Sequence, residues 1–146
     1  MSTTTANTFA TSAPASVSQD TLALIGRVLI ALLFVPAGFG KIAGFAGVVG
    51  YIGAVGLPLP QLGAVIAIAV ELGLGLLLLV GYKTRIVSII LAVFTVATAV
   101  FFHNYWAMPA DKAYINQLMF FKNIAVAGGL LAIAALGAGR FSIDKR

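Results

Sequence analysis

Three ionisable side chains lie inside long apolar stretches of this 146-residue sequence, and the chemistry of the chain is expected there. Arg27, Glu71 and Lys122 are each the single charged residue of such a stretch. A charged side chain at the centre of a membrane helix costs about 2.5–3.5 kcal/mol on insertion scales, so it is retained where it faces a partner or a polar cavity. These residues are therefore the first candidates for ligand binding or a proton relay.

Other polar residues fall near the ends of the same stretches. Lys41 closes the first stretch, His103 follows the third, and Asn123 is adjacent to Lys122. With both termini on one side of the membrane, Glu71 is expected about 13–14 Å below the opposite surface, at about 1.5 Å per residue. The spacing predicts an outward-opening polar pocket with Glu71 as its floor, lined by Lys41, Glu71, His103, Lys122 and Asn123.

The partner of Glu71 decides between two interpretations. Lys122 lies on its outward side and Arg27 on its cytoplasmic side, and spacing puts either one within reach of the carboxylate. A buried pair of this kind can serve a ligand or a proton path, but it can equally fix the register of two helices without any ligand. His103 has the same two interpretations, because a lone histidine near a membrane surface is often an ordinary interfacial side chain.

The composition excludes several other kinds of site. The sequence has no cysteine and one histidine, so it offers no disulfide, no thiolate metal site, no iron–sulfur ligation and no pair of histidines for haem. We expect no metal and no covalently bound cofactor, and no dinucleotide, P-loop or Ser–His–Asp motif is present. The net charge of +5 is scattered over loops and helix ends, so nucleic-acid binding is not expected. A redox role needs electrons from another molecule.

The elements that position these residues are four predicted membrane helices. Hydrophobic residues make up 61% of the sequence and charged residues 9%, which is outside the range of soluble domains. A membrane helix needs about 20 apolar residues to cross about 30 Å of hydrocarbon. The stretches close to this length are 21–40, 62–80, 86–102 and 118–138. We predict an all-α integral membrane protein whose transmembrane domain, residues 21–141, is a four-helix bundle.

Each predicted helix carries small and polar residues along one stripe. Small residues permit the close contacts that helices make in a membrane, so we predict that the four stripes meet on one axis. Counted at helical spacing, the stripes are Arg27, Phe34, Gly38 and Lys41; Ala64, Ala67, Glu71 and Gly75; Ser88, Ala92, Thr95, Ala99 and His103; and Lys122, Ala125, Gly129 and Ala132.

The segments outside the four helices give further expectations. Glycine recurs at every third position from Gly44 to Gly56, which favours a short interfacial or re-entrant segment over an ordinary flexible loop. Residues 1–20, rich in Ser, Thr and Ala, are predicted to be a disordered tail, and residues 142–146 a C-terminal tail. Five basic residues flank the helices on the side of the termini and two on the other, which predicts cytoplasmic termini.

The order of motifs along the chain is also informative. A first helix closed by GK is followed by GLPLP, by Glu71 in AVELGLGLLLL, by FH, by FFKN and by GAGRFSID. This order resembles the DoxX family of small four-helix bacterial membrane proteins, over about residues 22–144. The resemblance implies a multi-pass protein of the bacterial inner membrane. It also implies that Arg27, Gly38, Lys41, Pro58, Glu71, His103, Lys122 and Asn123 stand at motif positions of the family.

Some DoxX relatives are associated with quinone-linked sulfur oxidation or with membrane oxidoreductase complexes. The resemblance therefore implies a redox-associated subunit that binds a quinone or a similar amphipathic molecule, at most an accessory subunit of a quinone-linked oxidoreductase. Soluble or membrane partner proteins would supply the electrons. Two alternatives stay open: a small-solute binding or transport module, which with four helices would need a homodimer, and a structural assembly subunit whose polar core only sets packing.

Overall fold

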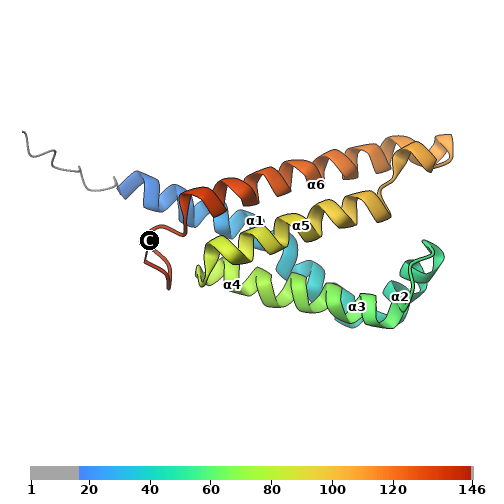
Figure 1. Cartoon of the computed structure of the whole chain (residues 1–146), viewed down its shortest axis with the longest axis horizontal. Coiled ribbons are helices and arrows are strands. Elements are labelled where there is room, and N and C mark those ends of the chain that lie inside the picture. The colour runs from blue at the N-terminus through green and yellow to red at the C-terminus, as the bar shows by residue number, and fades with distance from the viewer. Residues whose placement is uncertain (1–16, 146) are drawn as a thin grey trace, which may run out of the picture.

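The computed structural model describes residues 17–145, and its spans confirm the predicted transmembrane bundle (Figure 1). Most of the predicted N-terminal tail, residues 1–16, lies outside the described residues. Within the described range the chain is helical, and four helical stretches are long and apolar enough to cross a membrane. In chain order the elements are α1 (Val17–Ala43), α2 (Phe45–Ala54), α3 (Pro60–Ile68), the π-helix η1 (Ala69–Leu74), α4 (Gly75–Val80), α5 (Thr84–Phe102), the 3-10 turn η2 (Tyr105–Ala107) and α6 (Ala110–Leu136).

Proline sets two of the helix starts. Pro60 occupies the first helical position of α3, where its missing N–H has no partner to lose, and α3, η1 and α4 then continue as one membrane span. Pro109 precedes α6, which begins at Ala110 rather than at residue 118. Counting apolar residues misses the first turns of α3 and α6, because these turns are helical but polar. The glycine-rich link forms the short helix α2.

The two ends of the bundle differ in what they contain. The start of α1, the α4–α5 link and the segment after α6 lie at one end, here called the terminal end (Figure 1). The opposite, distal end holds the short helix α2 and the η2 turn (Figure 1). The terminal end is therefore built from the beginning, middle and end of the described chain.

Close backbone contact joins α1 to the second span. A Cβ placed on Gly38 would lie 2.8 Å from the Cβ of Leu72 and 2.9 Å from its backbone nitrogen, so only glycine fits between α1 and η1. A Cβ on Gly75 would lie 3.1 Å from the Cβ of Phe34. On the other side of the bundle α5 packs along α6. The bundle is thus two helix pairs around a core of Phe34, Leu78, Val87, Leu91, Ala92, Ala127 and Leu130.

The burial pattern agrees with the predicted stripes on the first three spans and differs on the fourth. Arg27, Glu71 and Thr95 are buried with most of their stripes. On α6 the prediction was wrong, since Lys122, Ala125 and Ala132 are exposed. Alanine and glycine occur on every face of α6, so small residues do not distinguish the face that packs against α5. The buried residues of α6 are Asn123, Ala127, Leu130 and Ala134.

The segment after α6 folds back over the terminal end, where residues 142–145 had been expected to form a tail. Arg27 is 0% exposed, and its guanidinium donates hydrogen bonds to the carbonyls of Leu78 (3.3 Å), Leu79 (2.8 Å) and Phe141 (2.5 Å). Asp144 accepts the backbone N–H groups of Lys83 and Thr84 at 2.9 and 2.8 Å. We call this arrangement the terminal clasp, made by Arg27, Phe141, Ile143 and Asp144.

The clasp satisfies the carbonyls that the end of α4 leaves open. The last carbonyls of a helix have no partner within it, and in a membrane protein an unpaired carbonyl is costly. Arg27 covers two of these groups, and backbone N–H groups cover the rest. The backbone pairs are Tyr82 N to Leu77 O, Gly81 N to Leu78 O, Ile143 N to Val80 O and Asp144 N to Gly81 O.

Candidate functional site

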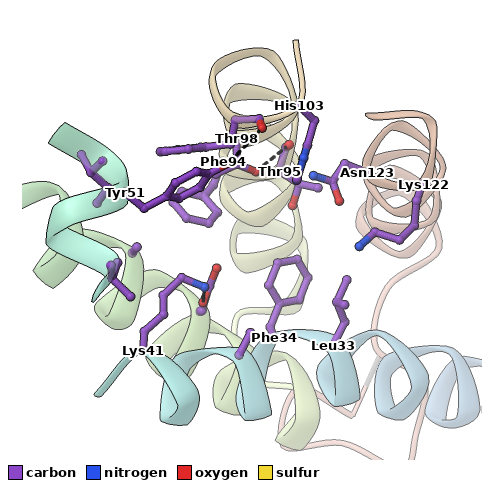
Figure 2. A pocket seen from close by; sticks show the side chains of 16 residues that line it. Leu33, Phe34, Lys41, Tyr51, Phe94, Thr95, Thr98, His103, Lys122 and Asn123 are labelled. Carbon is purple, nitrogen blue, oxygen red and sulfur yellow. Dashed lines mark hydrogen bonds and ion pairs between the residues drawn. The ribbon is translucent and has the colours of Figure 1, made fainter. Parts of the chain in front are cut away.

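A cavity of about 280 Å³ lies between the helices toward the distal end (Figure 2). All five residues predicted for the polar pocket line it: Lys41, Glu71, His103, Lys122 and Asn123. Figure 2 shows Leu33 and Phe34 reaching in from α1, Phe94 and Thr95 from α5, and Lys122 and Asn123 from α6. We call this space the distal cavity. Helical spacing alone had placed its polar residues together.

Glu71 forms an ion pair with Lys41 across the α1–η1 contact. Lys41 Nζ lies 2.6 Å from Glu71 Oε2, and the two side chains are 28% and 11% exposed. Sequence spacing had offered Lys122 and Arg27 as partners instead. The close approach of α1 to η1 at Gly38 brings Lys41, one turn further along α1, onto the carboxylate. The pair therefore forms one polar wall of the distal cavity.

The helical form around Glu71 is itself unusual. Residues Ala69–Leu74 form a π-helix, which is rare and found mostly as single turns inside α-helices, frequently at functional sites. Glu71 lies in this segment, and Leu72 beside it meets Gly38. The wider turn thus holds the carboxylate where α1 comes closest. Nothing in the apolar sequence of this span marks the π-helical segment.

His103 is oriented by a residue that the sequence did not suggest. Its Nδ1 lies 3.2 Å from Asn116 Oδ1, and Asn116 Nδ2 donates to the backbone carbonyl of Lys112 at 3.0 Å. Because the amide nitrogen of Asn116 is engaged, its oxygen is the atom that accepts from Nδ1. The neutral ring therefore keeps Nε2 as a hydrogen-bond acceptor. Asn123, buried on α6, adds a carboxamide to the same side of the distal cavity.

Aromatic side chains from three helices also line the distal cavity. Phe34 comes from α1, Phe94 and Phe102 from α5, and Tyr51 from α2. The Tyr51 and Phe102 rings lie 5.4 Å apart between centroids, and the Tyr51 hydroxyl donates to the Phe102 carbonyl at 3.3 Å. Sequence reasoning missed Phe94, Phe102 and Tyr51. The four-residue spacing of Phe94 and Thr98, and of Thr98 and Phe102, was the available signal.

Arg27 is not part of the distal cavity. The apolar core, including Phe34, Leu78 and Leu91, lies between the cavity and the terminal end. Arg27 lies beyond that core in the terminal clasp, where its hydrogen bonds go to backbone carbonyls. Its position supports a structural contribution there. Among residues 17–145 no group of three or more His, Cys, Asp or Glu side chains could hold a metal ion.

Comparison with known proteins gives consistent matches. The DoxX family model matches residues 22–104, which include Arg27, Lys41, Glu71 and His103. Inner membrane protein YphA of Escherichia coli is 37% identical over 129 residues, covering 88% of this chain and 92% of that protein. Inner membrane protein YqjF of the same organism is 41% identical over 127 residues, covering 87% and 92%.

A more distant match covers part of a longer protein. The ER-derived vesicles protein ERV29 of Saccharomyces cerevisiae is 33% identical over 67 residues, which are 46% of this chain and 22% of that protein. No solved structure matches. YphA and YqjF are thus inner membrane proteins of about the same length as this chain.

Proposed function

Because the chain belongs to the DoxX family, we propose that it is a redox-associated membrane subunit that binds a quinone or a similar small amphipathic molecule in the distal cavity. The protein is a multi-pass inner-membrane protein with four apolar spans in contact with the bilayer. The observation that carries the proposal is the lining of the cavity, which combines polar groups from two pairs of elements, α1 with η1 and α5 with α6, with three phenylalanine side chains. A quinone has the same pattern, an apolar ring with carbonyl oxygens at opposite edges.

The polar groups of the distal cavity include donors on both sides. Lys41 offers an ammonium group held by Glu71, and Asn123 and Lys122 offer N–H groups from α6. Each of these donors suits a quinone carbonyl, and the faces of Phe34 and Phe94 suit the ring. A volume of about 280 Å³ is just below the roughly 300–1,000 Å³ typical of drug-sized ligands, so a ring-sized head group is the expected occupant.

Two exposed lining residues on facing helices suggest how such a ligand would enter. Leu33 on α1 and Lys122 on α6 are both exposed, and they come from helices that contact each other only sparingly. An apolar tail attached to the ring can leave the distal cavity between them, into the bilayer. This favours a lipid-soluble ligand over a water-soluble one. It also gives the long Lys122 side chain a place at the rim of the cavity.

The chemical role proposed for the chain is binding and proton exchange. Reduction of a quinone to a quinol takes up two electrons and two protons. The electrons would come from a soluble or membrane oxidoreductase partner, because the sequence has no cysteine and one histidine. The protons would pass through Glu71 and His103, two titratable side chains that line the distal cavity. The chain would then be an accessory subunit.

Lys122→Ala should weaken binding of a short-tailed benzoquinone about tenfold, because a hydrogen bond from a charged donor contributes about 1.5–3 kcal/mol. Glu71→Gln should weaken it similarly, since Lys41 then loses the carboxylate that holds its ammonium group in the cavity. Binding is measured by calorimetry on protein in nanodiscs. Quenching of Trp106, the one tryptophan of the sequence, gives a second readout.

Lys112→Ala is the matched control for Lys122→Ala. Both lysines are exposed residues of α6, but Lys112 does not line the distal cavity, so its replacement should leave the affinity unchanged. The proposal fails if wild-type protein takes up no more benzoquinone than empty nanodiscs do. It also fails if Lys122→Ala and Glu71→Gln both bind as tightly as wild type.

We also propose that the terminal end faces the cytoplasm, since basic residues concentrate there. The natural chain has no cysteine, so single cysteines can be labelled without background. In intact cells a membrane-impermeant maleimide should label Ala107→Cys, an exposed distal residue. Lys145→Cys, exposed at the terminal end, should be labelled only after permeabilisation. The reverse pattern of labelling would invert the proposed orientation.

A further inference from the structure

A second cavity, of about 530 Å³, lies between α1 and α6 at the terminal end. None of its lining residues lines the distal cavity. The two spaces are separated where α1 meets α6, since a Cβ on Gly129 would lie 3.4 Å from Ile30 Cδ1. We call the second cavity the terminal groove. Its lining consists of Gln19, Asp20, Leu22, Ala23, Gly26, Ala132, Ile133, Leu136, Gly137, Gly139 and Arg140.

The walls of the terminal groove suit a hydrocarbon chain. Leu22, Ala23 and Gly26 on α1 face Ala132, Ile133 and Leu136 on α6 across the groove. Leu22 is 67% exposed and Leu136 is 82% exposed, so the groove is bordered by side chains open to the surrounding lipid. Its apolar walls give a polar solute little to bind. A flexible acyl chain fits such a surface without leaving polar groups unpaired.

The charged groups at the rim of the terminal groove select the head group. Arg140 lines the groove, its side chain is exposed, and no ion pair within residues 17–145 engages its guanidinium. Asp20, also in the lining, is 7% exposed, and its carboxylate accepts the backbone N–H of Arg140 at 2.9 Å. The Asp20 carboxylate is thus already bound to a backbone N–H group. Lys83 in the α4–α5 link, Arg85 at the start of α5 and Lys145 after α6 add positive charge at the same end.

From these features we infer that the terminal groove binds an anionic phospholipid, with one acyl chain between α1 and α6 and the phosphate at Arg140. Basic pockets between membrane helices commonly bind anionic lipid head groups. The apolar walls provide affinity for the chain, and the guanidinium provides preference for an anionic head group. This inference does not depend on a ligand in the distal cavity.

Gly26→Leu is the variant that fills the terminal groove. A Cβ at Gly26 meets no atom within 4 Å, because it points into open space, and Gly26 lines the groove. Gly128→Leu is its matched control, since a Cβ there also meets nothing within 4 Å and Gly128 does not line the groove. Both variants place leucine in a membrane helix, so their effects on insertion should be alike. Size-exclusion chromatography checks that each is folded.

The experiment is native mass spectrometry of protein released from vesicles of equal phosphatidylglycerol and phosphatidylcholine. Wild type and Gly128→Leu should retain one phosphatidylglycerol per chain, about fivefold over phosphatidylcholine. Gly26→Leu should lose retained lipid of both kinds. Arg140→Gln should keep a lipid but lose the preference, whereas Arg85→Gln, at an exposed residue outside the groove, should keep it. Equal retention of both lipids by wild type, or unchanged retention by Gly26→Leu, would overturn the inference.

Discussion

Arg27→Leu is expected to lower the thermal stability of the bundle by about 6–12 °C. The guanidinium is fully buried and donates to the carbonyls of Leu78, Leu79 and Phe141. Hydrogen bonds from a charged donor contribute about 1.5–3 kcal/mol each, and relief from burying the charge offsets part of their loss. A net loss of about 3 kcal/mol corresponds to this shift at about 2–4 °C per kcal/mol.

The destabilisation should be local to the terminal clasp at first. Leu79 O has no other partner within residues 17–145, so it would be left without a donor near the membrane. Unfolding is followed in detergent by circular dichroism. The control is Arg85→Leu, because Arg85 is an exposed arginine at the start of α5 and should tolerate the change. A melting temperature for Arg27→Leu that matches this control would mean that the clasp contributes little.

Gly38→Ala should cost both stability and ligand binding, although it adds a single methyl group. The new Cβ would lie 2.8 Å from Leu72 Cβ and 2.9 Å from Leu72 N, so α1 and η1 must move apart. Overpacking of this kind costs about 1–3 kcal/mol. The separation would also pull Lys41 away from Glu71, whose charged atoms are 2.6 Å apart. Benzoquinone affinity should therefore fall together with the melting temperature.

Gly40→Ala provides the matched control on the same helix. A Cβ at Gly40 meets nothing within 4 Å, and replacing an exposed helical glycine with alanine usually stabilises a protein by about 0.5–1 kcal/mol. The two variants add the same atoms two residues apart, so any difference between them reports the contact with Leu72. If Gly38→Ala is as stable as Gly40→Ala and binds as well, the close packing of α1 on η1 is not required.

The bundle and much of the candidate site follow from simple counting along the sequence. Apolar length predicts the four spans, and helical spacing brings Lys41, Glu71 and His103 to one interior. Apolar length and helical spacing are local properties of the chain, so they do not depend on the tertiary contacts. The face of α6 could not be predicted in this way, because alanine and glycine on all sides leave no contrast. Its orientation is chosen by packing against α5.

Two other features depend on contacts without a sequence pattern. The Lys41–Glu71 pair requires the close approach of α1 to a π-helical turn. The apolar residues around Glu71 contain no sequence signal that predicts this turn. The terminal clasp consists largely of backbone N–H and carbonyl groups, which every residue except proline has in common. Only the charges of Arg27 and Asp144 mark it. Such features were therefore visible only in the folded chain.

The contact of Ile30 with Gly129 has a thermodynamic consequence. The distal cavity lies on one side of this contact and the terminal groove on the other, and α1 and α6 contribute to both. A ligand in the distal cavity that favours a wider or narrower distance between α1 and α6 changes that distance at the terminal groove. A ligand in the terminal groove acts on the distal cavity in the same way. Such a coupling is reciprocal, so each occupant would alter the affinity of the other by the same factor.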